Sequence, residues 1–204
     1  MIDAFKKLLD HASSILITTH KSPDGDAIGS AVAFSKFVSA YGKNNHVLLP
    51  DAPASNLMSF LDGVSYSFFE DFDLRDSRYD LMICLDYNHP HRVGDKMKSF
   101  VLELNAPKIM IDHHPNPTEF CDLTISRPEV CSTAQLLYEV LQECQLHTYL
   151  TKEACEALYL GIMTDTGSFR FPSVTAKTHD VLKELLLKGA EGYTIHERVF
   201  DQNT

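Results

Sequence analysis

Continuous apolar runs in the first 124 residues constrain the fold of this chain more than any other feature. The runs are residues 14–19 (SILITT), 46–49 (HVLL), 65–69 (SYSFF), 81–85 (LMICL) and 108–111 (KIMI). Continuous rather than alternating apolarity is typical of strands buried on both faces, as in a parallel sheet covered by helices. Stretches between the runs have helical spacing, for example from Ile28 to Tyr41, where Gly42 suits a C-terminal cap.

The pattern after residue 131 is helical. Candidate N-terminal caps for three helices are Ser132 or Thr133, then Thr151, then Thr175. A chain of 204 residues is long enough to bury one sizeable core. We therefore predict one α/β domain, with an open, mostly parallel sheet of about five strands flanked by helices.

The composition is ordinary for a soluble globular protein, with 44% apolar and 23% charged residues. No apolar stretch is long enough to span a bilayer, and the N-terminus lacks the apolar core of a signal peptide. The five cysteines are scattered and form no C-x-x-C pair, which indicates reduced thiols in a cytosol. The net charge of −10 disfavours binding to a long polyanion. We therefore expect a cytoplasmic protein that contacts no membrane and no long nucleic acid.

Aspartate and histidine side chains follow several of the predicted strands. They are His20, Asp24 and Asp26 after 14–19, Asp86 after 81–85, Asp112, His113 and His114 after 108–111, and Asp165 after the apolar end of a helical stretch. The carboxyl ends of parallel strands open onto one crevice, so we expect these side chains to converge there. Clustered carboxylates repel one another, and divalent cations relieve that repulsion.

Each motif also has a purely structural interpretation. P-D-G-D at 23–26 is a common turn sequence, an aspartate after a strand often caps a helix, D-H-H can be a surface loop and D-T-G can end a helix. The combination favours a metal site, because independent turns rarely all supply metal ligands. Carboxylate and imidazole without thiolate suit Mn²⁺, with Mg²⁺, Co²⁺ and Fe²⁺ less favoured. The surplus of aspartates suggests two ions that share a bridging carboxylate.

The sequence resembles the DHH phosphoesterase family, and within it the NrnA-like branch, once called exopolyphosphatase-related proteins. The motifs that carry the resemblance are HKSPDGDAIGSA, LDYNHPHRVG, IDHHPN, STAQLLYE and GIMTDTGSFRFPSVTAKTH, in this order along essentially the whole chain. The resemblance implies that the D-H-H triplet ends its strand because catalytic metals lie there.

The resemblance also implies a role for each site residue. The expected ligands are His20, Asp24 and Asp86 for a first metal and Asp26, Asp86, His113 and Asp165 for a second, with Asp86 as the bridge. The expected catalytic residues are Asp86, His114, Asp112 and Arg92. Among these, His114 would contact the scissile phosphate, and Asp112 would orient His113 or its neighbour. Arg92 would contact phosphate or form a structural ion pair, and Ser132 and Thr133 would touch the site or cap a helix.

Residues 1–190 match the catalytic domain of this branch, and residues 191–204 resemble the start of a linker. Members of the branch carry a second, DHH-associated substrate-binding domain with a Gly-Gly-Gly-His motif, and this sequence contains no Gly-Gly pair. We therefore expect a catalytic domain without its partner domain, which would be weakly active alone.

The resemblance implies a metal-dependent phosphohydrolase that cleaves very short oligonucleotides, such as dinucleotides, to 5′-mononucleotides with a two-metal-activated water. Removal of the 3′-phosphate of adenosine 3′,5′-bisphosphate would be a second activity, and a homodimer would fit the related proteins. The alternatives are a phosphodiesterase for linear or cyclic dinucleotide signals, a pyrophosphatase-like hydrolase and a domain that binds metal or nucleotide without catalysis. An exonuclease of the RecJ type is disfavoured, because the net charge of −10 has the wrong sign for holding a long strand.

Overall fold

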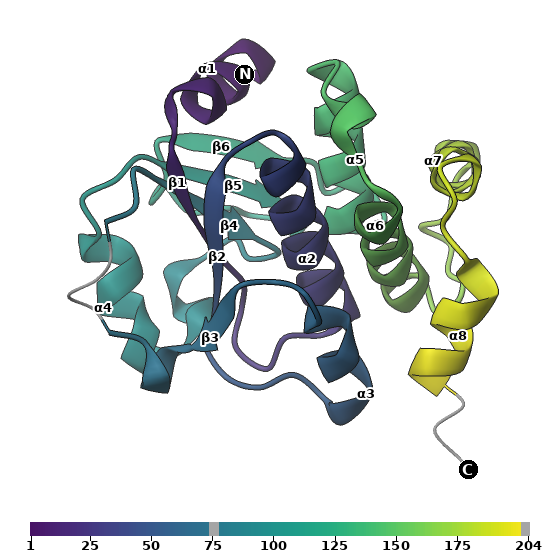
Figure 1. The fold of residues 1–204 in the computed structure, drawn as a ribbon, viewed down its shortest axis with the longest axis horizontal. Coiled ribbons are helices and arrows are strands. Elements are labelled where there is room, and N and C mark those ends of the chain that lie inside the picture. The colour runs from purple at the N-terminus through teal and green to yellow at the C-terminus, as the bar shows by residue number, and fades with distance from the viewer. Residues whose placement is uncertain (74–77, 201–204) are drawn as a thin grey trace.

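Parallel strands form the centre of the protein, whose computed structural model describes residues 1–73 and 78–200 (Figure 1). Six strands form one sheet in the order β3-β2-β1-β4-β5-β6, and each of their pairings is parallel. Their bounds are β1 Ser14–Thr18, β2 Asn44–Leu49, β3 Tyr66–Phe68, β4 Leu81–Leu85, β5 Lys108–Asp112 and β6 Leu123–Ser126. The chain first builds outward from β1 to β3 and then returns to add β4 on the other side of β1.

The predicted α/β fold is confirmed, with six strands instead of the expected five or so. The strand that the sequence did not reveal is β6, which pairs only with β5 at the edge of the sheet. Its sequence, LTIS, contains one fully buried residue, Ile125. An edge strand needs no continuous apolar run, so this segment lacks the signal that marks the inner strands.

Helices cover both faces of the sheet because the strand side chains alternate between two apolar clusters. Ile15 and Ile17 belong to the larger cluster, whereas Leu16 lies in the smaller one with Met97 of α4. Figure 1 shows α4 on one side of the sheet and α2, α5 and α6 on the other. The helices are α1 Ile2–His11, α2 Gly25–Ala40, α3 Ser55–Met58, α4 Asp95–Glu103, α5 Thr133–Glu143, α6 Lys152–Asp165, α7 Ala176–Leu187 and α8 Gly192–Phe200, with short 3-10 turns at Ser59–Leu61, Phe69–Asp71, Pro90–Val93 and His147–Tyr149.

Most predicted helix caps are found in the structure. Ser132, Thr151 and Thr175 each accept a backbone hydrogen bond at the start of α5, α6 and α7. Gly42 follows the end of α2 with φ of 83°, a left-handed conformation that glycine adopts without strain. Asp24 caps α2, because its carboxylate accepts from the backbone N–H groups of Asp26 and Ala27.

The predicted division into a domain of residues 1–190 and a following linker stays a prediction. The structure adds that 192–200 form helix α8, whose Ile195 and Val199 are buried. The Asn56 side chain of α3 donates to the carbonyl oxygen of Val199 at 3.0 Å. The predicted linker segment therefore begins with a helix packed on the body, and residues 201–204 lie outside the described residues. None of the described helices is long and apolar enough to cross a bilayer.

Two glycines bring α2 and α6 into close contact. A Cβ atom at Gly29 of α2 would lie 2.5 Å from the carbonyl oxygen of Ala157 and 2.7 Å from the backbone nitrogen of Gly161, both in α6. Because these neighbours are backbone atoms, they cannot rotate away. A Cβ at Gly161 would lie 2.7 Å from Oδ1 of Asp26, so the same contact places α6 against the site described below.

Gly29→Ala should destabilise the protein although alanine is the better helix former. The added methyl group forces the two helices apart, and overpacking of this kind costs about 1–3 kcal/mol of unfolding free energy. Chemical denaturation measures the change. Ser99→Ala on the exposed face of α4 is the control and should be neutral or slightly stabilising, and a Gly29→Ala protein as stable as this control would contradict the close packing.

Candidate metal centre

The predicted site residues lie together at the carboxyl ends of the strands. The strand order reverses between β1 and β4, and ligands of open α/β sheets bind outside the carboxyl ends of the strands at such a point. The loop after β1 and the first turn of α2 carry His20, Asp24 and Asp26, and Asp86 directly follows β4. Asp112 ends β5 and precedes the two histidines, while Asp165 ends α6. The structure thus brings the six predicted metal ligands together, and their role as ligands stays a prediction.

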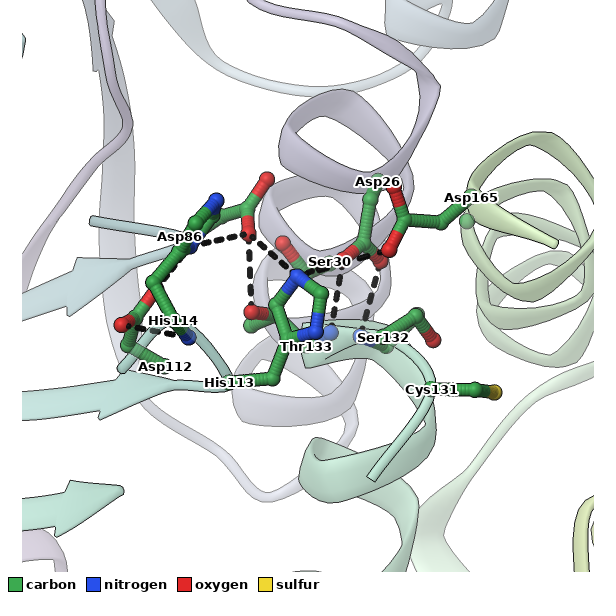
Figure 2. Close-up of polar contacts among 12 residues, drawn as sticks. Asp26, Ser30, Asp86, Asp112, His113, His114, Cys131, Ser132, Thr133 and Asp165 are labelled. Atoms are coloured by element: carbon green, nitrogen blue, oxygen red, sulfur yellow. Dashed lines mark hydrogen bonds and ion pairs between the residues drawn. The ribbon is translucent and has the colours of Figure 1, made fainter. Parts of the chain in front are cut away.

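Potential ligand atoms form three overlapping groups among the described residues, each with all its atoms within 4.8 Å of one another. The groups are His20, Asp24 and Asp86; Asp26, His113 and Asp165; and Asp86, His113 and His114. The first two groups match the ligand sets expected for two ions, with Asp86 close to both. Figure 2 shows His113 between Asp86 on one side and Asp26 and Asp165 on the other.

The Asp86 carboxylate directs one oxygen to each side of the site. Its Oδ2 lies 3.4 Å from Nε2 of His20, and its Oδ1 lies 3.8 Å from Nε2 of His113. The residue is 1% exposed and has φ of 65°, a left-handed conformation that aspartate adopts more readily than most residues. The tight turn after β4 thus directs this carboxylate toward His20 and His113 instead of along the strand.

His20 and His113 are both oriented as metal ligands usually are. Nδ1 of His20 lies 2.8 Å from the carbonyl oxygen of Lys21, and Nδ1 of His113 lies 3.3 Å from that of Val130. A carbonyl can only accept, so Nδ1 carries a proton in each ring and Nε2 is the nitrogen left to bind a metal. Nε2 of His20 is buried and has no hydrogen-bond partner among the described residues. A buried atom of this kind is costly unless a ligand satisfies it, which fits a cation.

The distances between ligand atoms also fit shared cations. Nε2 of His113 lies 3.4 Å from Oδ2 of Asp165 and 3.9 Å from Oδ2 of Asp26. Nε2 of His20 lies 3.7 Å from Oδ1 of Asp24. Two ligands on an ion with bonds of about 2.1 Å are roughly 3–4 Å apart. The donor set and its spacing therefore suit divalent ions such as Mn²⁺ or Mg²⁺.

The start of α5 fixes the position of the Asp26 carboxylate. The backbone N–H groups of Thr133 and Ala134 donate to its two oxygens at 2.6 and 2.9 Å. The Thr133 hydroxyl donates to Oδ1 of Asp86 at 2.9 Å (Figure 2). Thr133 is a site residue for which the sequence favoured a capping role. Ser132 is the cap, and Thr133 touches the site, which was the other alternative that the resemblance gave for these two residues.

The crowded carboxylates are hard to ionise together. Burial and the charges of Asp86 and Asp165 raise the pKa of Asp26 well above its ordinary value. Burial also raises the pKa of Asp165 to about 6, although His113 acts in the opposite direction. Burial lowers the pKa of His20, but Asp24 and Asp86 outweigh it and raise that pKa to about 10. The site therefore attracts positive charge, and without metal it takes up protons instead.

Asp112 pairs with His114 and not with His113. Its fully buried carboxylate accepts from Nδ1 of His114 at 2.8 Å and from the His114 backbone N–H at 2.9 Å. This hydrogen bond raises the pKa of His114. Arg92 is exposed and lies close enough to His114 to act against that increase. Whether Arg92 contacts phosphate or forms a structural ion pair stays a prediction.

Comparison with known proteins identifies the family. The family model for the "DHH family, N-terminal domain" matches residues 14–162. A crystal structure of an exopolyphosphatase-related protein from Bacteroides fragilis is 33% identical, with a TM-score of 0.94, and the match covers 100% of this chain and 61% of that one. The bifunctional oligoribonuclease and PAP phosphatase NrnA of Thermus thermophilus is 31% identical over 91% of this chain and 53% of its own length.

A third relative, the cyclic-di-AMP phosphodiesterase GdpP of Bacillus subtilis, is 26% identical over 92% of this chain and 30% of its own length. The chain thus spans only part of each of these relatives. The family match covers most of the chain, so this protein belongs to the DHH family.

Proposed function

We propose that this chain is the catalytic domain of an Mn²⁺-dependent phosphohydrolase that cleaves very short oligonucleotides to 5′-mononucleotides. The observation that carries the proposal is the Asp86 carboxylate, whose two oxygens face different groups of ligands, Oδ2 toward His20 and Oδ1 toward His113. The NrnA relative, by its name an oligoribonuclease and PAP phosphatase, supports this substrate class and adenosine 3′,5′-bisphosphate as a second substrate. We place the protein in the cytoplasm, and a homodimer fits the proposal.

The proposed ligand sets are His20, Asp24 and Asp86 for one ion and Asp26, Asp86, His113 and Asp165 for the other. When bound, such a pair of ions withdraws charge from a phosphodiester and makes water a better nucleophile at neutral pH. Asp86 would hold both ions at a fixed separation. Backbone carbonyls bind Nδ1 of both histidines, which leaves Nε2 of each ring to bind an ion.

His114 and Arg92 are proposed to act on the substrate. Asp112 raises the pKa of His114, so this imidazole stays protonated to a higher pH and can donate to a phosphate oxygen. Asp112 occupies Nδ1, and Nε2 forms no hydrogen bond within the described residues, so it can serve this purpose. The exposed guanidinium of Arg92 beside it offers further donors for the same phosphate. The chain spans about half the length of the NrnA relative, so a partner domain that completes substrate binding is part of this proposal.

A cyclic-dinucleotide phosphodiesterase is the second candidate, and the similarity to GdpP favours it. Both reactions need the same metal centre, so the residues described here do not separate them. The substrate does.

A panel of substrates in Mn²⁺ buffer should separate these activities. We expect the linear dinucleotide pApA to be hydrolysed faster than cyclic di-AMP, pyrophosphate or a long oligonucleotide, with mononucleotide as the product measured by chromatography. A long strand should be the poorest substrate, since the chain carries a net charge of −10. Faster cleavage of cyclic di-AMP would favour the second candidate instead, and no cleavage of any substrate would contradict an enzymatic role for this domain.

Asp86→Asn should abolish hydrolysis of pApA without unfolding the protein. The amide keeps the shape and can still accept from Thr133, but it cannot bridge two cations, so we expect a loss of roughly two orders of magnitude or more. In chelator the variant should be at least as thermally stable as the wild type, because one of three crowded charges is gone. Asp180→Asn on the exposed face of α7 is the control. Full turnover by Asp86→Asn would refute the proposal.

The metal-free protein should lose stability as the pH rises from about 4 to above 6. Burial raises the pKa of Asp165 to about 6 and that of Asp26 in the same direction, so the folded state binds protons that the unfolded state has released. Melting temperatures in chelator should therefore fall across this range, and Mn²⁺ should reverse the trend because it binds the ionised carboxylates. Asp165→Asn should flatten the dependence in chelator. A melting temperature that rises with pH in chelator would contradict this account.

A further inference from the structure

Thr133 contacts both buried carboxylates of the centre through different groups. As the first residue of α5 it donates its backbone N–H to Oδ2 of Asp26 at 2.6 Å and its hydroxyl to Oδ1 of Asp86 at 2.9 Å. Thr133 is 0% exposed and Asp86 is 1% exposed, so bulk water does not compete for the hydroxyl bond. The hydroxyl is therefore the donor that sets where Oδ1 of Asp86 points.

The Asp86 carboxylate needs such a donor. Its backbone is fixed by the left-handed turn and by the N–H that donates to the carbonyl oxygen of Ile111 at 3.2 Å. The last torsion of an aspartate side chain, however, is broad and holds no sharp preference of its own. The imidazole nitrogens around it are Nε2 of His20, Nδ1 of His114 and Nε2 of His113, which lie 3.4, 3.7 and 3.8 Å from its oxygens. Nδ1 of His114 donates to Asp112 instead, and neither Nε2 atom forms a hydrogen bond to Asp86 within the described residues, so none of the three fixes the rotation of the carboxylate.

The hydroxyl is not needed to start the helix. Ser132 provides the cap, since its Oγ accepts from the backbone N–H of Gln135 at 3.0 Å. The contact from α5 to Asp26 uses backbone N–H groups and does not depend on the Thr133 side chain. The Thr133 hydroxyl can therefore be removed while the helix start and the Asp26 contacts remain.

We propose that Thr133 is a positioning residue, whose hydroxyl orients Asp86 so that its two oxygens face two different cations. This inference rests on the proposed function, because it assumes that Asp86 bridges two ions. It adds that the bridge is preset by the protein before metal arrives and that α5 couples the positions of both buried carboxylates.

Calorimetric titration with Mn²⁺ alone, together with electron paramagnetic resonance of the Mn²⁺-loaded protein, tests this role without any substrate. Wild type should bind two Mn²⁺ per chain with a spectrum of exchange-coupled ions. Thr133→Val removes only the hydroxyl and should weaken Mn²⁺ binding roughly 10–100-fold and reduce the coupled signal. Thr133→Ser keeps the hydroxyl and should restore both. If the valine variant does not fold, Thr133→Ala replaces it as the hydroxyl-free variant.

Ser132→Ala is the matched control on the same helix end. It removes the cap, so it should lower the melting temperature but leave Mn²⁺ affinity within about twofold of wild type. The proposal is overturned if a folded hydroxyl-free variant binds Mn²⁺ like wild type with the same coupled spectrum, or if Ser132→Ala weakens binding equally. A wild type that binds no pair of ions would refute the two-ion site itself and this proposal with it, which distinguishes the two failures.

Discussion

Mutual repulsion between Asp26, Asp86 and Asp165 governs the properties of this site. Burial and neighbouring negative charge both raise the pKa of Asp26, and burial raises the pKa of Asp165 to about 6. Such a cluster does not stabilise the fold, because burying apolar side chains of similar volume would cost less free energy. Bound cations would offset the repulsion among these carboxylates, and the same arrangement would then favour cation binding. The fold tolerates the cluster because backbone N–H groups and one hydroxyl hold Asp26 and Asp86 in place.

The architecture determines which residues share this cluster. The switch point between β1 and β4 brings together two loops that are more than sixty residues apart in sequence, and β5 adds the D-H-H triplet beside them. Helix α6 is less constrained by the sheet, and its approach depends on Gly161, where a Cβ atom would reach within 2.7 Å of Asp26. Asp165 lies one helical turn further along α6. The close contact between α2 and α6 therefore decides whether the last carboxylate reaches His113.

The sequence predicts the fold class and the residues at the centre, because continuous apolar runs and the polar residues after them are local signals. It does not predict contacts that depend on orientation. Asp24 was interpreted as part of a turn or as a ligand, whereas its carboxylate caps α2 and also lies 3.7 Å from Nε2 of His20. Ser132 and Thr133 are adjacent and chemically alike, yet the first caps α5 and the second contacts Asp86. Strand β6 was missed for a related reason, since an edge strand with one fully buried side chain has a weak local pattern.

The same electrostatics imply an order of binding. A phosphodiester is anionic, and the site without metal presents four carboxylates, of which Asp24 and Asp86 face His20 whereas Asp26 and Asp165 face His113. His114 and the exposed Arg92 stand beside this cluster, and a phosphate held by them alone would still face the net negative charge behind them. Bound cations would reverse that charge, and only then would a phosphate gain from approaching Asp86. In the proposed reaction, metal binding would therefore precede productive substrate binding, and the residues that preset the proposed metal ligands would act on every later step.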